Sequence, residues 1–208
     1  RVQDNYVAQW GDATESKPLP ERVIADPPAE YARPGWSGVT TLTRPDPYAR
    51  LSGYDADGWP VASDGAESWL PHCYAMVGVA RDLAPSTGTG AELYAVIGHA
   101  PRHLDRNLAM VGRVIAGIEH LSTLPRGSGA LGFYDDPTRR VAIERVRLGS
   151  DLLEAERPRV EIRDTGNRRF DAYLLQRENR EPPFFERPAG GADICNVPVA
   201  VREVALPD

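Results

Sequence analysis

The chain opens with Arg1-Val2-Gln3-Asp4-Asn5-Tyr6-Val7-Ala8-Gln9-Trp10-Gly11-Asp12, the stretch that decides the fold. We interpret it as a strand of the core that carries an arginine, an aromatic residue, a glutamine and a Gly-Asp pair at defined spacings. A chain that starts inside a core strand, without Met, is typical of a processed or cropped polypeptide. We therefore expect further sequence upstream of Arg1.

Size and charge narrow the possible classes of protein. The 208 residues carry a formal net charge of -6, and 41% of them are hydrophobic. This length allows one domain with decorations, or two small ones, around a sizeable core. Binding to a phosphate backbone needs clustered Lys and Arg, so we expect no nucleic acid partner. No run of 18 apolar residues occurs, and the sequence predicts no membrane-spanning segment.

Residues 13 to about 68 are dense in Pro, Gly, Asp and Ser. Such density argues against long helices and central strands. Aromatic residues are nevertheless too frequent in this stretch for a flexible linker. They are Tyr31, Trp36, Tyr48, Tyr54, Trp59 and Trp69. We expect an ordered but irregular excursion that packs on the body of the protein.

The next part of the chain reads as a series of strands. Apolar runs at 73–80 and 92–98 flank a turn-rich loop at 85–90, which predicts two buried strands joined by that loop. A third strand is expected at 108–114 and a short helix at 116–124. Apolar and polar residues alternate over 141–148, which indicates a half-buried strand that closes the β-rich part near Gly149.

The last part, 150–208, has a different pattern. Phe170, Tyr173 and Leu174 have helical spacing and predict a helix over 167–179. Residues 194–204 predict an edge strand around Pro198. Cys73 and Cys195 fit no metal spacing. They are either two buried free thiols or a disulfide that ties the C-terminal tail to the body and implies an oxidising compartment.

Four pieces of this sequence together resemble the cyclophilin family of peptidyl-prolyl isomerases. The opening stretch matches its signature F-H-R-x-x-x-x-F-x-x-Q-x-G-D from the arginine onward. The second piece, Gly78-Val79-Ala80-Arg81, is similar to S-M-A-N, and the third, Thr89-Gly90-Ala91-Glu92-Leu93-Tyr94, is similar to N-G-S-Q-F-F. The fourth, His103-Leu104-Asp105 with Val111-Gly112-Arg113-Val114, is similar to W-L-D followed by V-F-G-x-V. All four pieces follow the family's order. The resemblance covers roughly residues 1–12 and 73–149.

The resemblance implies a fold and a set of domain limits. We expect a mainly β protein, a cyclophilin-like closed antiparallel β-barrel of eight strands with short helices, whose N-terminal strands are absent from this chain. Residues 1–149 would form the cyclophilin-like domain, with the Pro-rich insertion at about 13–68. Residues 150–208 would be a C-terminal extension packed on the barrel. The missing N-terminal segment of the same protein would be needed to complete that barrel.

The resemblance also implies an activity and a set of site residues. The resemblance is to a bacterial-type cyclophilin, whose activity is cis-trans isomerisation of X-Pro bonds in unfolded or flexible protein segments. This activity needs no metal or other cofactor. Arg1 would be the catalytic guanidinium, and Tyr6, Val7, Tyr94 and Leu104 would form the proline pocket. Gln9, Ala80 and Arg81 would line the substrate backbone. His103 would stand at the rim of the pocket.

Two departures from the family pattern keep an alternative open. Leu108 stands where the family has a rim histidine, and Arg81 replaces an asparagine. A catalytically weak proline-peptide-binding or chaperone-like module with the same fold is therefore the second hypothesis. The third hypothesis is a purely structural fragment, which a chain that stays unfolded without its missing N-terminal strands would favour. A periplasmic or exported location is favoured over a cytoplasmic one by the cysteine pair.

Three other motifs receive less weight. His99, His103 and Asp105 could bind a metal, but Pro101 breaks the helix that would align the two histidines. The Gly88-Thr89-Gly90 loop precedes a strand, whereas phosphate loops open a helix. Gly35-Trp36-Ser37-Gly38 is one residue shorter than a nucleophile elbow and lies in the Pro-rich stretch.

Overall fold

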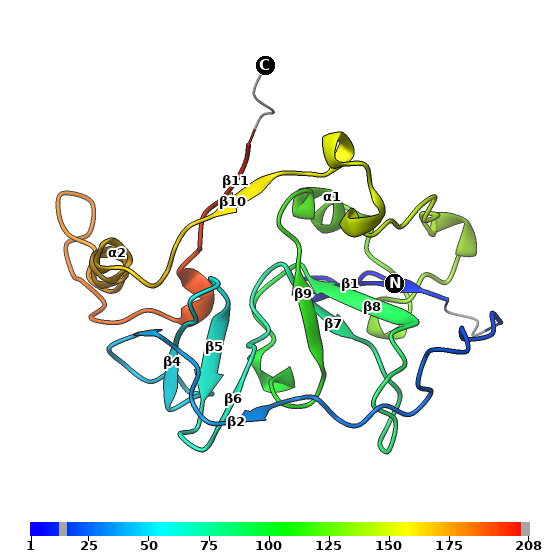
Figure 1. The fold of residues 1–208 in the computed structure, drawn as a ribbon, viewed down its shortest axis with the longest axis horizontal. Helices are drawn as coiled ribbons and strands as arrows, with labels where there is room; N and C mark the ends of the chain where they lie inside the picture. The colour runs from blue at the N-terminus through cyan, green and yellow to red at the C-terminus, as the bar shows by residue number, and fades with distance from the viewer. Residues whose placement is uncertain (13–15, 205–208) are drawn as a thin grey trace.

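The computed structural model describes residues 1–12 and 16–204. It is mainly β, with three antiparallel groups of strands (Figure 1). A four-stranded sheet has the order β1-β8-β7-β9, and its strands are β1 (Val7–Gly11), β7 (Met76–Val79), β8 (Glu92–Val96) and β9 (Met110–Arg113). Among the described residues, no helix has the length and apolar content needed to span a bilayer.

The strands expected at 73–80, 92–98 and 108–114 are confirmed as β7, β8 and β9 of this sheet. β7 pairs with β8 through Val77 and Ala95, and with β9 through Val77 and Gly112. Met76, Ala95 and Val96 are fully buried, as expected for strands made of short continuous apolar runs. The helix expected near 116–124 is α1 (Ile118–Ser122).

The opening stretch forms a hairpin, whereas the sequence predicted a single strand. Val2 bridges to Ala8 in antiparallel fashion, and the Gln3 amide donates to the Val7 carbonyl. Asn5 turns the chain with a φ of 51°, a conformation that asparagine adopts more readily than most residues. β1 then pairs with β8, so that Gln9 lies opposite Tyr94. The hairpin places Arg1 beside Gln9.

The expectation of an irregular excursion without central strands at 13–68 was wrong. Residues 33–69 form a five-stranded antiparallel sheet of order β2-β6-β5-β4-β3. Its central strand β5 begins at Pro60, and a proline without an amide hydrogen is tolerated at the first position of a strand. The strands are β2 (Arg33–Pro34), β3 (Thr40–Thr41), β4 (Leu51–Tyr54), β5 (Pro60–Ser63) and β6 (Glu67–Trp69).

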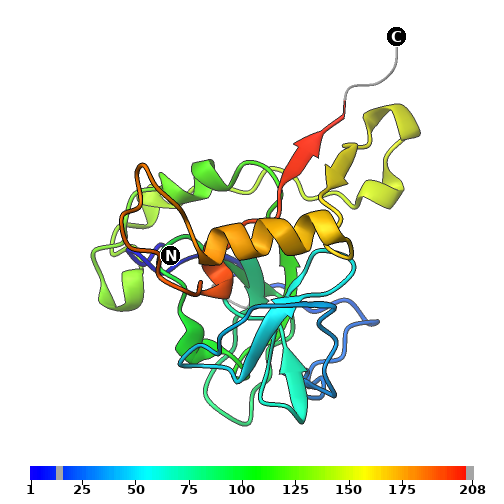
Figure 2. The same cartoon turned by 90° about the vertical axis from the view of Figure 1, so that its left-hand side faces the viewer.

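The C-terminal part returns to the body and packs there. The predicted helix is confirmed as α2 (Arg168–Glu178), and Figure 2 shows it lying across the side of the molecule beside β4. Phe170 of α2 is buried edge-on against Tyr54 of β4, with ring centroids 5.3 Å apart. Cys73 and Cys195 form a disulfide, so the free-thiol alternative was wrong and the other holds.

The expected edge strand at 194–204 is present only as β11 (Val201–Glu203), which pairs with β10 (Val160–Ile162). This two-stranded ribbon projects from the body in both views (Figures 1 and 2). Short 3₁₀ turns connect the other elements: η1 (Arg102–Leu104), η2 (Ala130–Gly132), η3 (Pro137–Arg139), η4 (Gly149–Asp151), η5 (Glu154–Glu156) and η6 (Ile194–Asn196).

The strand expected at 141–148 is absent. These residues have no strand partner in the described part of the chain, and Val146 is 81% exposed. None of the three sheets closes on itself among residues 1–12 and 16–204, so the closed barrel is not observed. That additional N-terminal strands complete the barrel stays a prediction.

Candidate functional site

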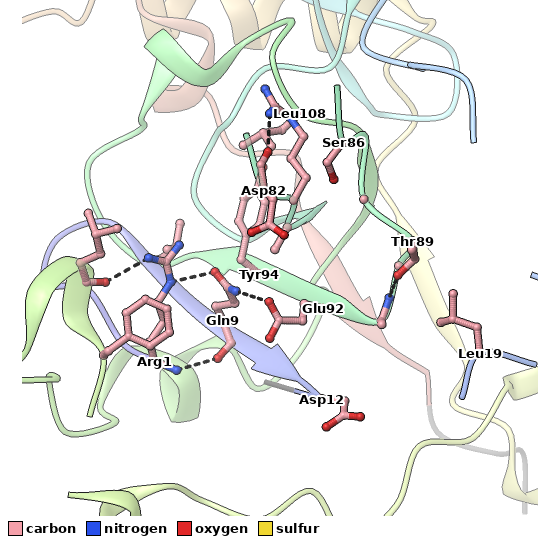
Figure 3. A pocket seen from close by; sticks show the side chains of 18 of the residues that line it. Arg1, Gln9, Asp12, Leu19, Asp82, Ser86, Thr89, Glu92, Tyr94 and Leu108 are labelled. Atoms are coloured by element: carbon pink, nitrogen blue, oxygen red, sulfur yellow. Dashed lines mark hydrogen bonds between the residues drawn. The ribbon is translucent and has the colours of Figure 1, made fainter. Parts of the chain in front are cut away.

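A cavity of about 1050 Å³ lies against the face of β1 and β8. Nine of the ten site residues named from the sequence line it: Arg1, Tyr6, Val7, Gln9, Ala80, Arg81, Tyr94, Leu104 and Leu108. They come from segments up to a hundred residues apart in the chain. Figure 3 shows that several of these side chains converge on one space.

Arg1 is held in a defined position at the cavity. Its Nε donates to Gln9 Oε1 at 2.8 Å, and its Nη1 donates to the Leu131 carbonyl at 3.3 Å. The guanidinium also lies 5.0 Å from the centre of the Phe133 ring, within cation–π range. Burial lowers the pKa of Arg1, and the carboxylate of Glu92 acts against that shift.

Gln9 connects Arg1 to an acidic residue on the neighbouring strand. Its Nε2 donates to Glu92 Oε2 at 2.8 Å, which fixes the amide so that Oε1 faces Arg1. Figure 3 shows this row of Arg1, Gln9 and Glu92 along the wall of the cavity. Because β1 and β8 are adjacent strands, the row is set by the sheet itself.

The apolar part of the cavity adjoins this row. Val7 and Tyr94 are each 3% exposed and form one packed cluster with Val96. Tyr6, Ala80 and Leu108 pack against that cluster from the cavity side. The cavity thus combines a fixed guanidinium with an apolar surface, a combination of shape and polarity found in ligand sites.

His103 is the predicted site residue that does not line the cavity. It lies in η1, where its Nε2 is 2.8 Å from the Tyr6 hydroxyl and its ring stacks on that of Tyr6 at 5.7 Å. Burial raises the pKa of Tyr6. His103 therefore contacts a lining residue without lining the cavity itself.

Arg81 and Leu108 occupy the far side of the cavity. The Arg81 Nε donates to the Asn107 carbonyl at 3.1 Å, and the Arg81 Nη1 donates to the Asp82 carbonyl at 2.7 Å. The same guanidinium lies 5.9 Å from the ring of Tyr31. Arg81 thus joins the loop at 81–82 to the N-terminal part of the Pro-rich stretch.

Sequence reasoning missed an outer wall of the cavity. Lys17, Pro18, Leu19, Pro20 and Val23 line it, and Figure 3 shows Leu19 on the side opposite Arg1. The Thr87 hydroxyl, which donates to the Pro27 carbonyl at 2.6 Å, helps to join this stretch to the neighbouring loop. Isolated apolar residues in a polar stretch were the only signal. The missed lining on the Arg1 side is Leu131 and Phe133, which follow the last motif of the resemblance.

The three residues considered as metal ligands have separate partners. The His99 amide donates to Asn5 Oδ1 at 2.8 Å, His103 bonds Tyr6, and Asp105 accepts from His72 and Arg102. Across residues 1–12 and 16–204, no group of three or more His, Cys, Asp or Glu side chains is placed to hold a metal ion.

Comparison with known proteins identifies the fold. No protein-family model matches the sequence, and no curated protein matches it. A solved structure does match: the crystal structure of cyclophilin AquaCyp293 from Hirschia baltica superposes with a TM-score of 0.67. The match covers 100% of this chain and 76% of that chain at 22% sequence identity. The chain therefore has a cyclophilin-type fold, as the four motifs predicted.

Proposed function

We propose that this protein is a peptidyl-prolyl cis-trans isomerase that acts on X-Pro bonds of unfolded or flexible protein segments. One observation carries the proposal: the guanidinium of Arg1 and the apolar side chains of Val7, Tyr94 and Leu108 line the same cavity. An apolar surface accepts the pyrrolidine ring, and the adjacent cation reaches the amide that the ring carries. The cyclophilin-type fold supports this assignment.

The chemistry requires no covalent step. An X-Pro amide resists rotation by about 18–20 kcal/mol because its nitrogen donates electron density into the carbonyl. During rotation the prolyl nitrogen becomes pyramidal and its lone pair localises. Arg1 donates a hydrogen bond to that lone pair in the twisted state, and the apolar wall keeps out competing water. Gln9 and Glu92 hold the guanidinium ready, which limits its reorganisation during the reaction.

The second candidate is a module that binds proline-containing peptides without accelerating their isomerisation. Two observations favour it: Leu108 offers no polar group at the rim, and the Arg81 guanidinium is bonded to two carbonyls of its own chain. Both reduce the polar contacts left for a substrate backbone. The two candidates differ in rate and agree in binding.

Exchange spectroscopy by NMR on a proline-containing peptide separates the two candidates. Catalytic amounts of the protein are expected to raise the cis-trans exchange rate, which without a catalyst has a time constant of about 10–100 s. Chemical-shift changes of the peptide without any change in exchange rate support the binding module instead. A peptide that shows neither effect contradicts both candidates.

We also propose an exported or periplasmic location. The Cys73–Cys195 disulfide supports it, since disulfides persist in oxidising compartments and are rare in the cytosol of most organisms. Cell fractionation of the native host, with thiol-specific labelling of each fraction, tests this. Unlabelled cysteines in the exported fraction are expected, and a protein confined to the cytosol with both thiols labelled contradicts the proposal.

A further inference from the structure

A row of buried polar side chains lies behind the apolar wall of the cavity. His72 is fully buried and does not line the cavity, yet its Nε2 lies 2.7 Å from the Tyr94 hydroxyl. Its Nδ1 lies 3.0 Å from Asp105 Oδ1, and its backbone amide donates to the same oxygen at 2.9 Å. The His72 side chain therefore bridges a carboxylate and a residue of the cavity wall.

The other carboxylate oxygen extends the row away from the cavity. Asp105 Oδ2 accepts from Arg102 Nε at 2.6 Å and from Trp69 Nε1 at 3.2 Å. Arg102 then reaches Asp46 at 2.9 Å. Burial acts to raise the pKa of Asp105, but hydrogen bonds from His72 and the charge of Arg102 outweigh it, and the pKa lies below its usual range. Asp105 is thus a carboxylate, which only accepts hydrogen bonds.

These contacts determine where the protons lie. Because Asp105 accepts, the Nδ1 of His72 carries the ring proton, and the Nε2 of a neutral imidazole is then an acceptor. Burial raises the pKa of Tyr94, so its phenol keeps its proton. The Tyr94 hydroxyl also lies 3.8 Å from the weak acceptor Met110 Sδ, and we assign its proton to the closer and stronger acceptor, His72 Nε2.

The neighbouring strand leaves room for this arrangement. Gly78 of β7 lies opposite Tyr94 in the sheet, and a Cβ added at Gly78 would overlap the Tyr94 hydroxyl. The rings of His72 and Tyr94 are nearly parallel, with an interplanar angle of 9°. The polar end of Tyr94 is bound inside the protein, and its ring serves as an apolar wall.

We propose that His72 is a positioning residue of this cavity: by accepting a hydrogen bond from the Tyr94 hydroxyl it holds the tyrosine ring as the fixed wall on which a substrate proline packs. The inference rests on the proposed function, because that function supplies the proline ring. An unanchored Tyr94 adopts other orientations, and substrate binding carries the cost of ordering it. The wall contacts ground state and transition state alike, so its loss raises KM and leaves kcat near the wild-type value.

Two substitutions at His72 separate positioning from mere support of the fold. In His72→Asn the side-chain amide group lies near the position of the His72 Nδ1 and keeps the contact with Asp105. In His72→Gln the longer side chain places its amide group near the position of Nε2 and keeps the contact with Tyr94. We expect His72→Asn to raise KM about tenfold, the effect of one buried hydrogen bond. His72→Gln is expected to restore KM to within about threefold of wild type.

Asp46→Asn is the control at the far end of the row. It weakens the Arg102 ion pair and is expected to lower the stability while leaving KM and kcat unchanged. KM and kcat come from NMR exchange rates measured over a range of peptide concentrations. Equal KM values for His72→Asn and His72→Gln, or a rise in KM for Asp46→Asn in step with its loss of stability, overturn the inference.

A spectroscopic measurement on the wild-type protein covers the case in which a His72 variant does not fold. The ¹⁵N shifts of the His72 ring are expected to show a protonated Nδ1 and an accepting Nε2, and the Nε2 shift should move in Tyr94→Phe and on titration with a proline peptide. A protonated Nε2, or no response to a peptide that binds, overturns the inference alone. A wild-type protein that neither binds nor isomerises the peptide overturns the proposed function and this inference together.

Discussion

At the scale of single residues, the Tyr54 hydroxyl joins the C-terminal segment to the five-stranded sheet. Tyr54 is 2% exposed, and its hydroxyl donates to the Ile194 carbonyl at 2.9 Å and contacts the Val197 carbonyl. Tyr54→Phe leaves those carbonyls without this donor and is expected to lower the free energy of unfolding by about 1–3 kcal/mol. Urea denaturation measures it.

Tyr48→Phe is the matched control for that substitution. Tyr48 is 49% exposed, and its ring keeps the Arg102 contact when the hydroxyl is removed. Its free energy of unfolding should stay within about 0.5 kcal/mol of wild type. Equal losses in the two variants would contradict the role assigned to the Tyr54 hydroxyl.

Asp105 links the stability of the fold to pH. Its pKa in the folded protein lies below the ordinary value of 3.8, so the carboxylate stabilises the protein above that pH. This contribution is lost as the pH falls below 3.8 and through the folded-state pKa. Asp105→Asn is expected to lower stability at pH 7 and to flatten the fall in stability below pH 3.8, measured by denaturation at a series of pH values.

The exposed Asp26→Asn serves as the control for this pH series, and it should leave the stability at pH 7 near that of wild type. If the stability of the Asp105→Asn protein fell with pH below 3.8 as steeply as that of wild type, other carboxyl groups would govern acid unfolding.

At the scale of elements, the disulfide connects the strand region at residue 73 with η6. The two cysteines are 122 residues apart, and in the chain-entropy model a loop of this size contributes about 4–5 kcal/mol of stability. Reduction of the wild-type protein should lower its denaturation midpoint by a corresponding amount. The Cys73→Ala, Cys195→Ala double variant should start from the lower midpoint and show no response to reductant. A wild-type midpoint that reductant does not change would contradict this contribution.

The segment 141–147 gives the opposite expectation. Within the described residues its backbone amides donate no hydrogen bond, and Val141 and Val146 are 66% and 81% exposed. Its amides should exchange with deuterium at rates near those of an unstructured peptide, while those of β7 and β8 are protected. Protection of 141–147 comparable to β8 would contradict the absence of a strand partner.

Elements with a strong local pattern were predictable from the sequence. Continuous apolar runs determined β7 and β8, and the helical spacing of Phe170, Tyr173 and Leu174 determined α2, because burial reinforces these patterns directly. The five-stranded sheet was missed because proline density masked it. Pro60 stands at the start of β5 and Pro34 in the edge strand β2, where a missing amide hydrogen costs little.

Residue pattern alone was insufficient for 141–148. Its alternation predicts a strand, but a strand forms only with a partner, and the described chain offers none. The positions of Arg1, Gln9 and Tyr94 at one cavity were predictable because sequence motifs contain them, and their roles stay predictions. The wall from 17–23 and the role of His72 depend on contacts between distant segments that no local motif encodes.

At the scale of the whole molecule, the fold brings a charged row and an apolar wall to one cavity. The hairpin places Arg1 beside Gln9, β8 supplies Glu92 and Tyr94, and the Pro-rich stretch closes the outer side. The lining of the cavity thus comes from several elements, and the Arg1 guanidinium is held by Gln9 of β1 and by the Leu131 carbonyl. This arrangement supports the proposal that the cavity binds an extended peptide and acts on one of its bonds.

The most direct test of the account compares Arg1→Ala with wild type in proline-peptide isomerisation. Loss of one preorganised donor is expected to lower kcat by about 10²-fold with little change in KM. Arg168→Ala, an exposed arginine of α2, should match wild type in both constants. An Arg1→Ala protein that isomerises the peptide at the wild-type rate would contradict the central claim that this guanidinium accelerates rotation of the X-Pro bond.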